Sequence, residues 1–151
     1  MNEMKRLELI TLAVQYCQKV KEKGMPSSCF SKALREPIHF LWETRNGPKY
    51  KVAQYRSKSA FAEISGNGKI IYDHSIPFRY LQDELLNLDD VNNKTVKELL
   101  ELYSTVCVIT KDEDNLLSSR GLSRKMPSDW DNEDPLARYK AVGIEVEINE
   151  F

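Results

Sequence analysis

The chain has 151 residues, of which 41% are hydrophobic and 30% are charged, and its formal net charge is -1. This composition is typical of one folded globular domain and excludes an intrinsically disordered chain. The near-neutral charge excludes a strongly basic protein that coats nucleic acid without sequence preference, although it leaves room for a local basic face.

The cysteines and the apolar runs bear on the cellular compartment. Cys17, Cys29 and Cys107 are widely spaced and form no C-x-x-C pair, so the sequence predicts neither a cysteine zinc site nor a disulfide framework. Reduced thiols of this kind are typical of a cytoplasmic protein. No run approaches the roughly 18 apolar residues that span a bilayer, and the N-terminal stretch lacks the continuous apolar core of a signal peptide. We therefore expect no contact with a membrane.

The first third of the chain is predicted to be helical. Apolar side chains recur at helical spacing over residues 4–23, and Gly24 ends this helix. A second helix is expected over residues 28–36. Because a proline disrupts a helix interior, Pro37 is predicted to begin a third helix, 37–43.

Strands and helices alternate in the centre of the chain. Residues 49–65 are predicted to form a loop or a short strand and then a helix, which the glycines of residues 66–68 break. The β-branched run at residues 69–73 predicts a strand. A helix is expected over residues 76–86, because Pro77 can occupy a first turn.

Two capping boxes are predicted in the second half. Thr95 and Glu98 have the spacing that lets a hydroxyl and a carboxylate satisfy the first amides of a helix, here one that runs to residue 103. The strand 105–109 is almost entirely β-branched and is expected to be buried on both faces. Thr110 and Glu113 repeat the capping pattern, and a helix to Ser119 follows.

The C-terminal part contains a polar stretch, 124–134, followed by a short helix, 134–139, and a strand, 144–148, that alternates apolar and acidic residues. We predict a mostly helical α+β protein, one domain over residues 1–151, around a sheet of two or three strands. The domain has three predicted parts: a helical N-terminal part at 4–65, a core at 69–121, and a C-terminal helix and strand at 134–149.

The pair Asp73–His74 at the end of the strand 69–73 suggests chemistry. A second strand follows later, and the helix after it has Asp112, Glu113 and Asp114 in its first turn. If the two strands pair, this helix can pack across them and bring its acidic turn toward Asp73 and His74. This is the order of elements in a ββα-metal site.

The stretch Tyr72–Pro77 resembles the first motif of the HNH nuclease family, and the resemblance extends over about residues 69–119. It implies that His74 is the general base, that Asp73 is a ligand of Mg²⁺ or Mn²⁺, and that Asp112 or Asp114 is the second ligand. A neutral imidazole suits the first task, and a hard cation prefers carboxylate oxygen. Four basic side chains could hold the flanking phosphates: Lys111, Arg120, Arg124 and Lys125.

The sequence departs from the family pattern on the later helix. The family usually places a histidine or an asparagine there, whereas this helix begins with acidic residues and Asn115, and no histidine follows His74. The HNH-like site is therefore either an acidic variant or a degenerate one without catalysis.

Ordinary structural roles compete with these catalytic ones. Asp73 can cap a turn, Glu113 can be the capping partner of Thr110, and Asp112 and Asp114 suit the positive end of a helix dipole. The basic and aromatic stretch at residues 49–58 can stack against a nucleic-acid strand, or it can be a solvated face.

Three functions follow from these patterns. The first is an HNH-like, metal-dependent endonuclease that acts on nucleic acid. The second is a non-catalytic binding protein, such as a phage or mobile-element inhibitor of a host-defence complex, whose acidic residues 129–134 contact a basic nucleic-acid-binding partner. The third is a small-ligand module with Tyr50 and Tyr55 near an anionic ligand. Convergence of Asp73, His74 and Asp114 would distinguish the first from the others.

Overall fold

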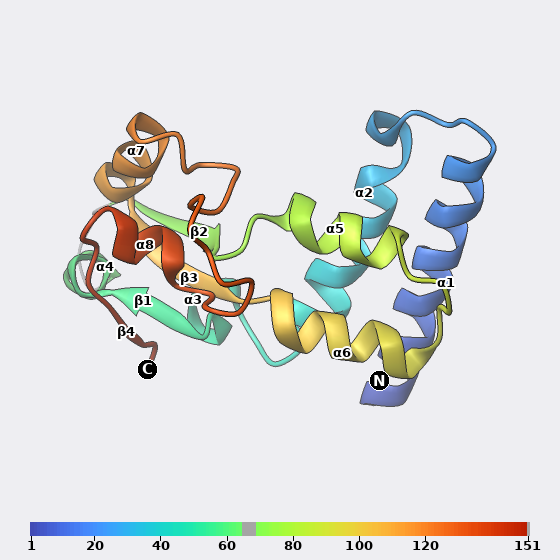
Figure 1. Ribbon diagram of the computed structural model, residues 1–151. Coiled ribbons are helices and arrows are strands. Elements are labelled where there is room, and N and C mark those ends of the chain that lie inside the picture. Colours follow the sequence, from blue (N-terminus) through green and yellow to red (C-terminus); the bar gives the residue numbers. More distant parts are fainter. Residues whose placement is uncertain (65–68, 151) are drawn as a thin grey trace. The chain divides into compact units, whose positions relative to one another are not determined.

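The computed structural model describes residues 1–64 and 69–150, and its chain divides into two compact units (Figure 1). Unit 1 contains Met1–Asn46 and Phe78–Tyr103, and unit 2 contains Gly47–Pro77 and the residues from Ser104 onward. The chain thus leaves unit 2 after Pro77 and returns to it at Ser104. The predicted break at residues 66–68 lies outside the described residues. The predicted α+β class is confirmed.

Unit 1 is entirely helical. Its elements are α1 (Glu3–Glu22), α2 (Ser27–Ile38), a π-helical turn η1 (His39–Glu43), α5 (Phe78–Leu86) and α6 (Asn93–Tyr103). The helices enclose an apolar core that includes Leu7, Ile10, Val14, Cys17, Phe30, Leu34, Ile38, Trp42, Leu81, Leu85, Val96 and Leu100.

Helix α1 forms where the apolar spacing predicts it. The Asn2 side chain accepts a hydrogen bond from the Lys5 amide at 2.8 Å, which satisfies one of the free amides of the first turn. After the helix, Gly24 has a φ of 95°, a left-handed conformation that costs glycine little.

The prediction that Pro37 begins a new helix is wrong. Helix α2 continues through Pro37 to Ile38, and the chain then widens into the π-helical turn η1. Pro37 lies in the last turn, where a missing amide donor removes only one hydrogen bond and the helix is about to change its pitch. The Thr44 amide closes the wider turn on the His39 carbonyl at 2.9 Å.

Unit 2 combines a sheet with short helices. Its elements are α3 (Lys49–Val52), β1 (Tyr55–Ser57), α4 (Lys58–Ile64), β2 (Ile70–His74), β3 (Val106–Thr110), α7 (Lys111–Ser119), α8 (Ala137–Ala141) and β4 (Val146–Ile148). The strand order is β2-β3-β1-β4, with β1 parallel to β3 and the other two neighbouring pairs antiparallel. The sheet has one strand more than the largest predicted number.

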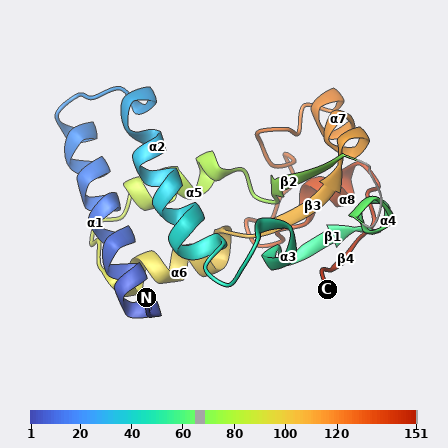
Figure 2. The same ribbon diagram turned by 180° about the vertical axis from the view of Figure 1, so that it is seen from behind.

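Helices cover both faces of this sheet (Figures 1 and 2). On one face, Cys107 and Ile109 of β3 pack with residues of α7 and α8 such as Leu117 and Tyr139. On the other face, Val106 and Val108 pack with the α3–α4 side of the unit. The expectation that this strand is buried on both faces is confirmed.

The two predicted capping boxes have different outcomes. The box at Thr110 and Glu113 is confirmed at the start of α7. The box at Thr95 is wrong, because α6 begins two residues earlier. Instead, the Asn92 side chain accepts hydrogen bonds from the Lys94 and Thr95 amides, at 2.9 and 3.0 Å. An asparagine side chain reaches these amides without a partner three residues on, so it competes directly with the Thr95 pattern.

Other boundaries differ from the prediction by a few residues. The strands predicted at 69–73 and 105–109 each begin and end one residue later, and the terminal strand is shorter. The helix predicted at 134–139 begins at Ala137, because Asp134 and the residues after it form a capped turn first. In the part of the chain that the structure describes, no helix is both long and apolar enough to cross a bilayer.

Candidate functional site

The ββα order predicted around Asp73 is present. β2 and β3 pair antiparallel, and α7 follows β3 directly. The register places Ile70 opposite Thr110, so α7 begins beside the start of β2. Asp73 lies three residues further along the strand, about 10 Å away at roughly 3.3 Å per residue. The acidic first turn of α7 therefore lies at the other end of the β2–β3 pair from Asp73 and His74.

Asp73 and His74 point to opposite faces of the sheet. Both residues are in the regular ladder, opposite Cys107 and Val106 respectively, and successive side chains of a strand alternate between faces. The His74 ring contacts the Tyr72 ring edge-on, with centroids 5.8 Å apart, whereas the Asp73 carboxylate lies on the α8 side. The two side chains do not form one site.

The Asp73 carboxylate binds two side chains of α8. Its Oδ2 accepts hydrogen bonds from Arg138 Nη1 at 2.9 Å and from the Tyr139 hydroxyl at 2.6 Å. The Arg138 side chain is 1% exposed and that of Asp73 is 15% exposed. Burial and the nearby Asp73 charge raise the pKa of Tyr139, so its hydroxyl stays protonated and donates.

The Arg138 guanidinium also binds backbone carbonyls from two segments. Its Nη1 donates to the His74 and Ser75 carbonyls at 2.9 and 3.3 Å. Its Nε donates to the Leu122 carbonyl at 2.7 Å, and its Nη2 reaches the Ser123 carbonyl at 3.4 Å. Arg138 therefore joins the end of β2 to the loop that follows α7, and Asp73 compensates its charge.

The three acidic residues in the first turn of α7, among them the predicted second ligands Asp112 and Asp114, have other roles or none at this site. Glu113 Oε1 accepts hydrogen bonds from the Thr110 amide at 2.9 Å and from the Ser57 hydroxyl. Asp114 pairs with Lys111 at 3.3 Å on the surface, and Asp112 is exposed. Within the described residues, no group of three or more histidine, cysteine, aspartate or glutamate side chains could hold a metal ion. The side chains here do not fit a Mg²⁺ or Mn²⁺ site.

The four basic residues predicted to hold phosphates are all exposed. Lys111 pairs with Asp114, Arg120 directly follows α7, and Arg124 and Lys125 lie in the loop beyond it. Their role in binding nucleic acid stays a prediction. The residue that sequence reasoning missed is Arg138. Its sequence neighbourhood carries no signal of burial, because arginine is ordinarily an exposed residue.

A pocket of about 350 Å³ lies beside α8, and we call it the Trp130 pocket. Its lining residues are Pro127, Asp129, Trp130, Asp131, Asp134, Ala137, Lys140 and Ala141. The Trp130 indole donates to the Asp134 carbonyl at 2.9 Å, and Lys140 pairs with the Asp134 carboxylate at 2.7 Å. Hydrogen bonds from the Asp134 and Glu133 amides lower the pKa of Asp131, and Lys140 lowers that of Asp134. The pocket is therefore aromatic and anionic at neutral pH.

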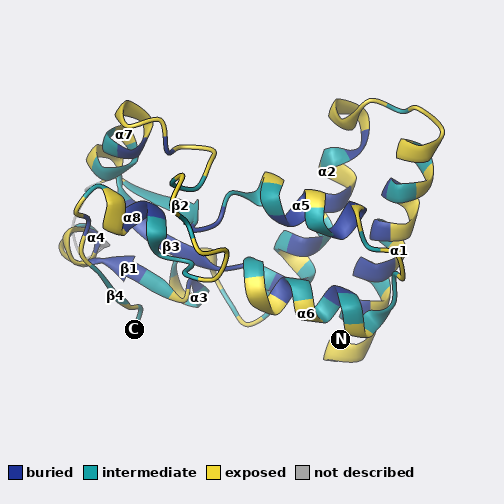
Figure 3. Ribbon diagram, viewed as in Figure 1, coloured by how far each residue is buried: buried dark blue, intermediate teal, exposed yellow. Residues whose placement is uncertain are grey.

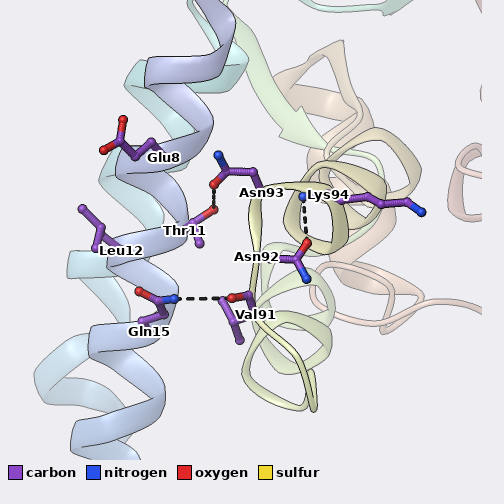
Figure 4. Close-up of a pocket in the computed structure, with 8 residues that line it drawn as sticks. All are labelled: Glu8, Thr11, Leu12, Gln15, Val91, Asn92, Asn93 and Lys94. Carbon is purple, nitrogen blue, oxygen red and sulfur yellow. Dashed lines mark hydrogen bonds between the residues drawn. The ribbon is translucent and has the colours of Figure 1, made fainter.

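A groove of about 540 Å³ lies in unit 1, between α1 and residues 91–94 (Figure 4). The Thr11 hydroxyl donates to Asn93 Oδ1 at 2.8 Å, and the Gln15 side chain donates to the Val91 carbonyl at 3.3 Å. The charged side chains in its lining are Glu8 and Lys94. With one carboxylate, one amine and no histidine or cysteine, this lining carries no acid–base pair suited to hydrolysis.

Comparisons of this chain with known proteins identified no related protein. No protein-family model matches the sequence, and comparisons with curated proteins and with solved structures gave no match. The resemblance to the HNH family therefore rests on the short motif around His74 and on the order of β2, β3 and α7.

Proposed function

We propose that this protein acts by binding and not by metal-dependent hydrolysis, and that its partner presents a basic surface. One observation supports the first half of this proposal. The carboxylate of Asp73, which the nuclease hypothesis needs as a metal ligand, is held by Arg138 and Tyr139. The Arg138 guanidinium is therefore already bound to the carboxylate that a metal would need as a ligand.

The energetics favour keeping Arg138 there. If a metal drew Asp73 away, the guanidinium would remain buried without its counter-charge, and breaking a buried ion pair in this way typically costs about 3–5 kcal/mol. The metal would also need further carboxylates, and Asp112 and Asp114 lie at the other end of the paired strands β2 and β3. Binding a divalent ion at Asp73 is therefore unfavourable on both counts.

The Trp130 pocket supports the second half of the proposal. Asp129 and Asp131 flank an indole ring in its lining. A lysine or arginine side chain is attracted both by the face of a tryptophan ring and by neighbouring carboxylates. Proteins that bind nucleic acid expose many such side chains. An inhibitor that covers the nucleic-acid-binding surface of a host-defence complex is one role of this kind.

The first experiment tests for metal chemistry. Calorimetric titration with Mn²⁺ is expected to give no binding heat, and plasmid DNA and RNA are expected to stay intact with Mg²⁺, Mn²⁺, Ca²⁺ or Zn²⁺. His74→Ala is the companion variant. Metal-dependent nicking by the native protein that disappears in His74→Ala would overturn the proposal.

A nuclease is the second candidate, because the antiparallel β2–β3 pair followed by α7 has the ββα order. In that case His74 would activate water from the face opposite Asp73, and a metal would need ligands other than those predicted. The nicking assay with His74→Ala decides between the two functions.

The second experiment tests the Trp130 pocket with a fluorescein-labelled oligoarginine peptide, measured by anisotropy at physiological salt. Asp129→Lys is the variant, because Asp129 lines the pocket and makes no hydrogen bond or ion pair with the rest of the described chain. Glu133→Lys is the matched control: it is exposed, nearby and outside the lining. We expect Asp129→Lys to weaken binding about threefold to tenfold, and Glu133→Lys to change it less than twofold. Equal losses would indicate general charge attraction only.

A further inference from the structure

Strand β4 forms a border of the sheet in unit 2. Among the strands that the structure describes, β4 has β1 as its single neighbour. The ladder continues at both ends: the Lys58 amide donates to the Glu145 carbonyl, and the Asn149 amide donates to the Gln54 carbonyl, both at 3.0 Å. In an antiparallel ladder the bonded residues are two apart, so Glu145, Glu147 and Asn149 turn their backbone groups toward β1.

The backbone groups of Val146 and Ile148 consequently point away from the sheet. Neither residue has another backbone partner among the described residues. Four hydrogen-bonding groups, two N–H and two C=O, are thus available along this border. A row of such groups is a template on which an extended segment can pair.

The side chains of β4 sort cleanly onto the two faces. Glu145 and Glu147 lie on one face, and Val146 and Ile148 lie on the other. Ile148 is 65% exposed. On the β1 side, Glu145 Oε2 pairs with Lys58 at 2.9 Å and Glu147 Oε1 pairs with Arg56 at 3.2 Å. Each carboxylate has a second oxygen that can accept a hydrogen bond from a neighbour on the open border.

We propose that an extended segment of another protein, with alternating basic and apolar residues, adds to β4 as a fifth strand. The backbone of Val146 and Ile148 would supply four hydrogen bonds. Basic side chains of the segment would face Glu145 and Glu147, and an apolar side chain would cover Ile148. Acidic and apolar side chains alternate along β4, so the matching segment should have basic and apolar side chains at alternate positions.

A second copy of this chain fits the border less well. Antiparallel pairing of two β4 strands about Glu147 places that residue directly opposite its own equivalent. A shift toward Val146 places Glu145 opposite Glu147 twice. A shift in the other direction places Glu147 opposite Asn149 and Val146 opposite Glu150. Like charges directly opposite each other destabilise a sheet, and none of these registers gives Glu147 an opposite charge, as a basic partner would. This inference does not depend on the Trp130 pocket.

The test uses a fluorescein-labelled peptide of alternating lysine and valine. In ¹⁵N NMR spectra, the amide hydrogens of Val146 and Ile148 are expected to exchange rapidly in the free protein and at least tenfold more slowly with the peptide. The amide of Glu147, which bonds to β1, should be protected throughout. The same peptide with an N-methyl group on every amide is the matched probe, since it keeps the charge but has no N–H on either edge with which to pair.

Two variants at one position test the border itself. Ile148→Pro removes an outward N–H without removing a bond to β1, and we expect it to weaken peptide binding at least tenfold. Ile148→Thr keeps the N–H and the β-branch, and should weaken binding less than threefold. Circular dichroism checks that both variants fold. If Ile148→Pro does not fold, the comparison of the N-methylated and unmethylated peptides decides whether the peptide pairs with β4.

Three outcomes would overturn the inference. Equal binding of the methylated and unmethylated peptides would mean that charge alone attracts them. Unchanged exchange at Val146 and Ile148 would place the peptide elsewhere. Sedimentation that shows a dimer lost in Ile148→Pro would identify a second copy as the occupant. Asp129→Lys should leave this peptide's affinity within twofold, which separates this test from that of the Trp130 pocket.

Discussion

The two units of the molecule are stabilised in different ways. The interior of unit 1 consists mainly of apolar side chains from its helices, as the buried stripes in Figure 3 indicate. Unit 2 also has an apolar core, but it buries a complete guanidinium, Arg138, with Asp73 and Tyr139 as its partners. In unit 1 the buried carboxylate of Glu43, 2% exposed, lies 3.2 Å from the His39 ring near the end of a helical segment. In unit 2 the buried guanidinium of Arg138 joins several segments of the fold.

The difference between the two units bears on how polar residues in a sequence are interpreted. In unit 1, Asn2 and Asn92 cap helix ends near the surface, and the Gln18 side chain donates to three backbone carbonyls at the end of α5 and just beyond it. In unit 2, a polar residue at a strand end looks catalytic in the sequence but serves to neutralise a buried cation. A buried charge is costly unless it is paired, so such a partner is as constrained as a catalytic residue.

The largest effect is expected from breaking the ion pair of unit 2. Arg138→Met leaves the Asp73 carboxylate without its cation and leaves several carbonyls without a donor. We expect the free energy of unfolding to fall by about 3–5 kcal/mol. Urea denaturation measures it. Arg124→Met, at an exposed position, is the control and should change stability by less than about 0.5 kcal/mol.

A double-mutant cycle sharpens this prediction. If Asp73 and Arg138 stabilise each other, Asp73→Asn combined with Arg138→Met should cost less than the sum of the two single changes. Strict additivity would show that Arg138 acts through its carbonyl contacts alone, and the comparison between the two units would lose its main support.

A cavity in the core of unit 1 is expected to have a somewhat smaller effect. Ile10 is fully buried, and Ile10→Ala should reduce the free energy of unfolding by about 3 kcal/mol through lost burial and an unfilled cavity. Leu12→Ala on the same helix is the control, because Leu12 is 54% exposed. Urea denaturation followed at several wavelengths also shows whether Ile10→Ala and Arg138→Met shift the same transition. A loss at Leu12 as large as that at Ile10 would contradict the assigned faces of α1.

Loss of the capping box of α7 should have an effect of about 1 kcal/mol. Thr110→Ala removes the acceptor of the Glu113 amide, now 3.1 Å away, and loosens the geometry that holds Glu113 near Ser57. Ser118→Ala at the other end of the helix is the matched change. If thermal unfolding shows that the two variants are equally stable, the box contributes nothing beyond helix propensity.

Protonation of Asp134 in acid should weaken its ion pair with Lys140 at the Trp130 pocket. This is the smallest of the effects that we predict. The pKa of Asp134 is lowered by Lys140, so its stabilising contribution is complete above the usual aspartate pKa of about 3.9 and is lost as the pH falls through the lowered value. Tryptophan fluorescence is expected to change below about pH 4 in the native protein. Asp134→Asn should show part of that change already at pH 7. A fluorescence signal in Asp134→Asn that matches the native one at every pH would refute this link.

Much of the fold could be predicted from the sequence because local patterns decided it. The stripe of α1, the β-branched run of β3 and the capping box at Thr110 each act over a few residues. At residues 55–57 the sequence left a loop and a short strand as alternatives, because β1 has three residues and owes its conformation to β3 and β4 on either side. The prediction that Pro37 begins a new helix is wrong for the opposite reason. The local disruption of a helix by proline was outweighed by the packing of α2 and η1.

The candidate site could be predicted only in part. The sequence indicated that Asp73–His74 ends a strand of a ββα element, and this order is present. It could not show that register separates Asp73 from Asp112 and Asp114, because register depends on which residues pair across the sheet. Nor could it show that the Asp73 and His74 side chains point to opposite faces of the sheet. The predicted strand ends at Asp73, and a His74 outside the ladder need not follow the alternation of side chains along a strand.

The α+β class, most helices, the central strands and the acidic character of residues 129–134 follow from the sequence, because hydrophobic period, capping and charge are local properties. The contacts of Asp73 depend on the tertiary structure. Its partner Arg138 is 65 residues away along the chain, and α8 brings the two together across the face of the sheet. A carboxylate at a strand end has the same local pattern whether it holds a metal or a guanidinium. What lies opposite it in the folded protein determines its role.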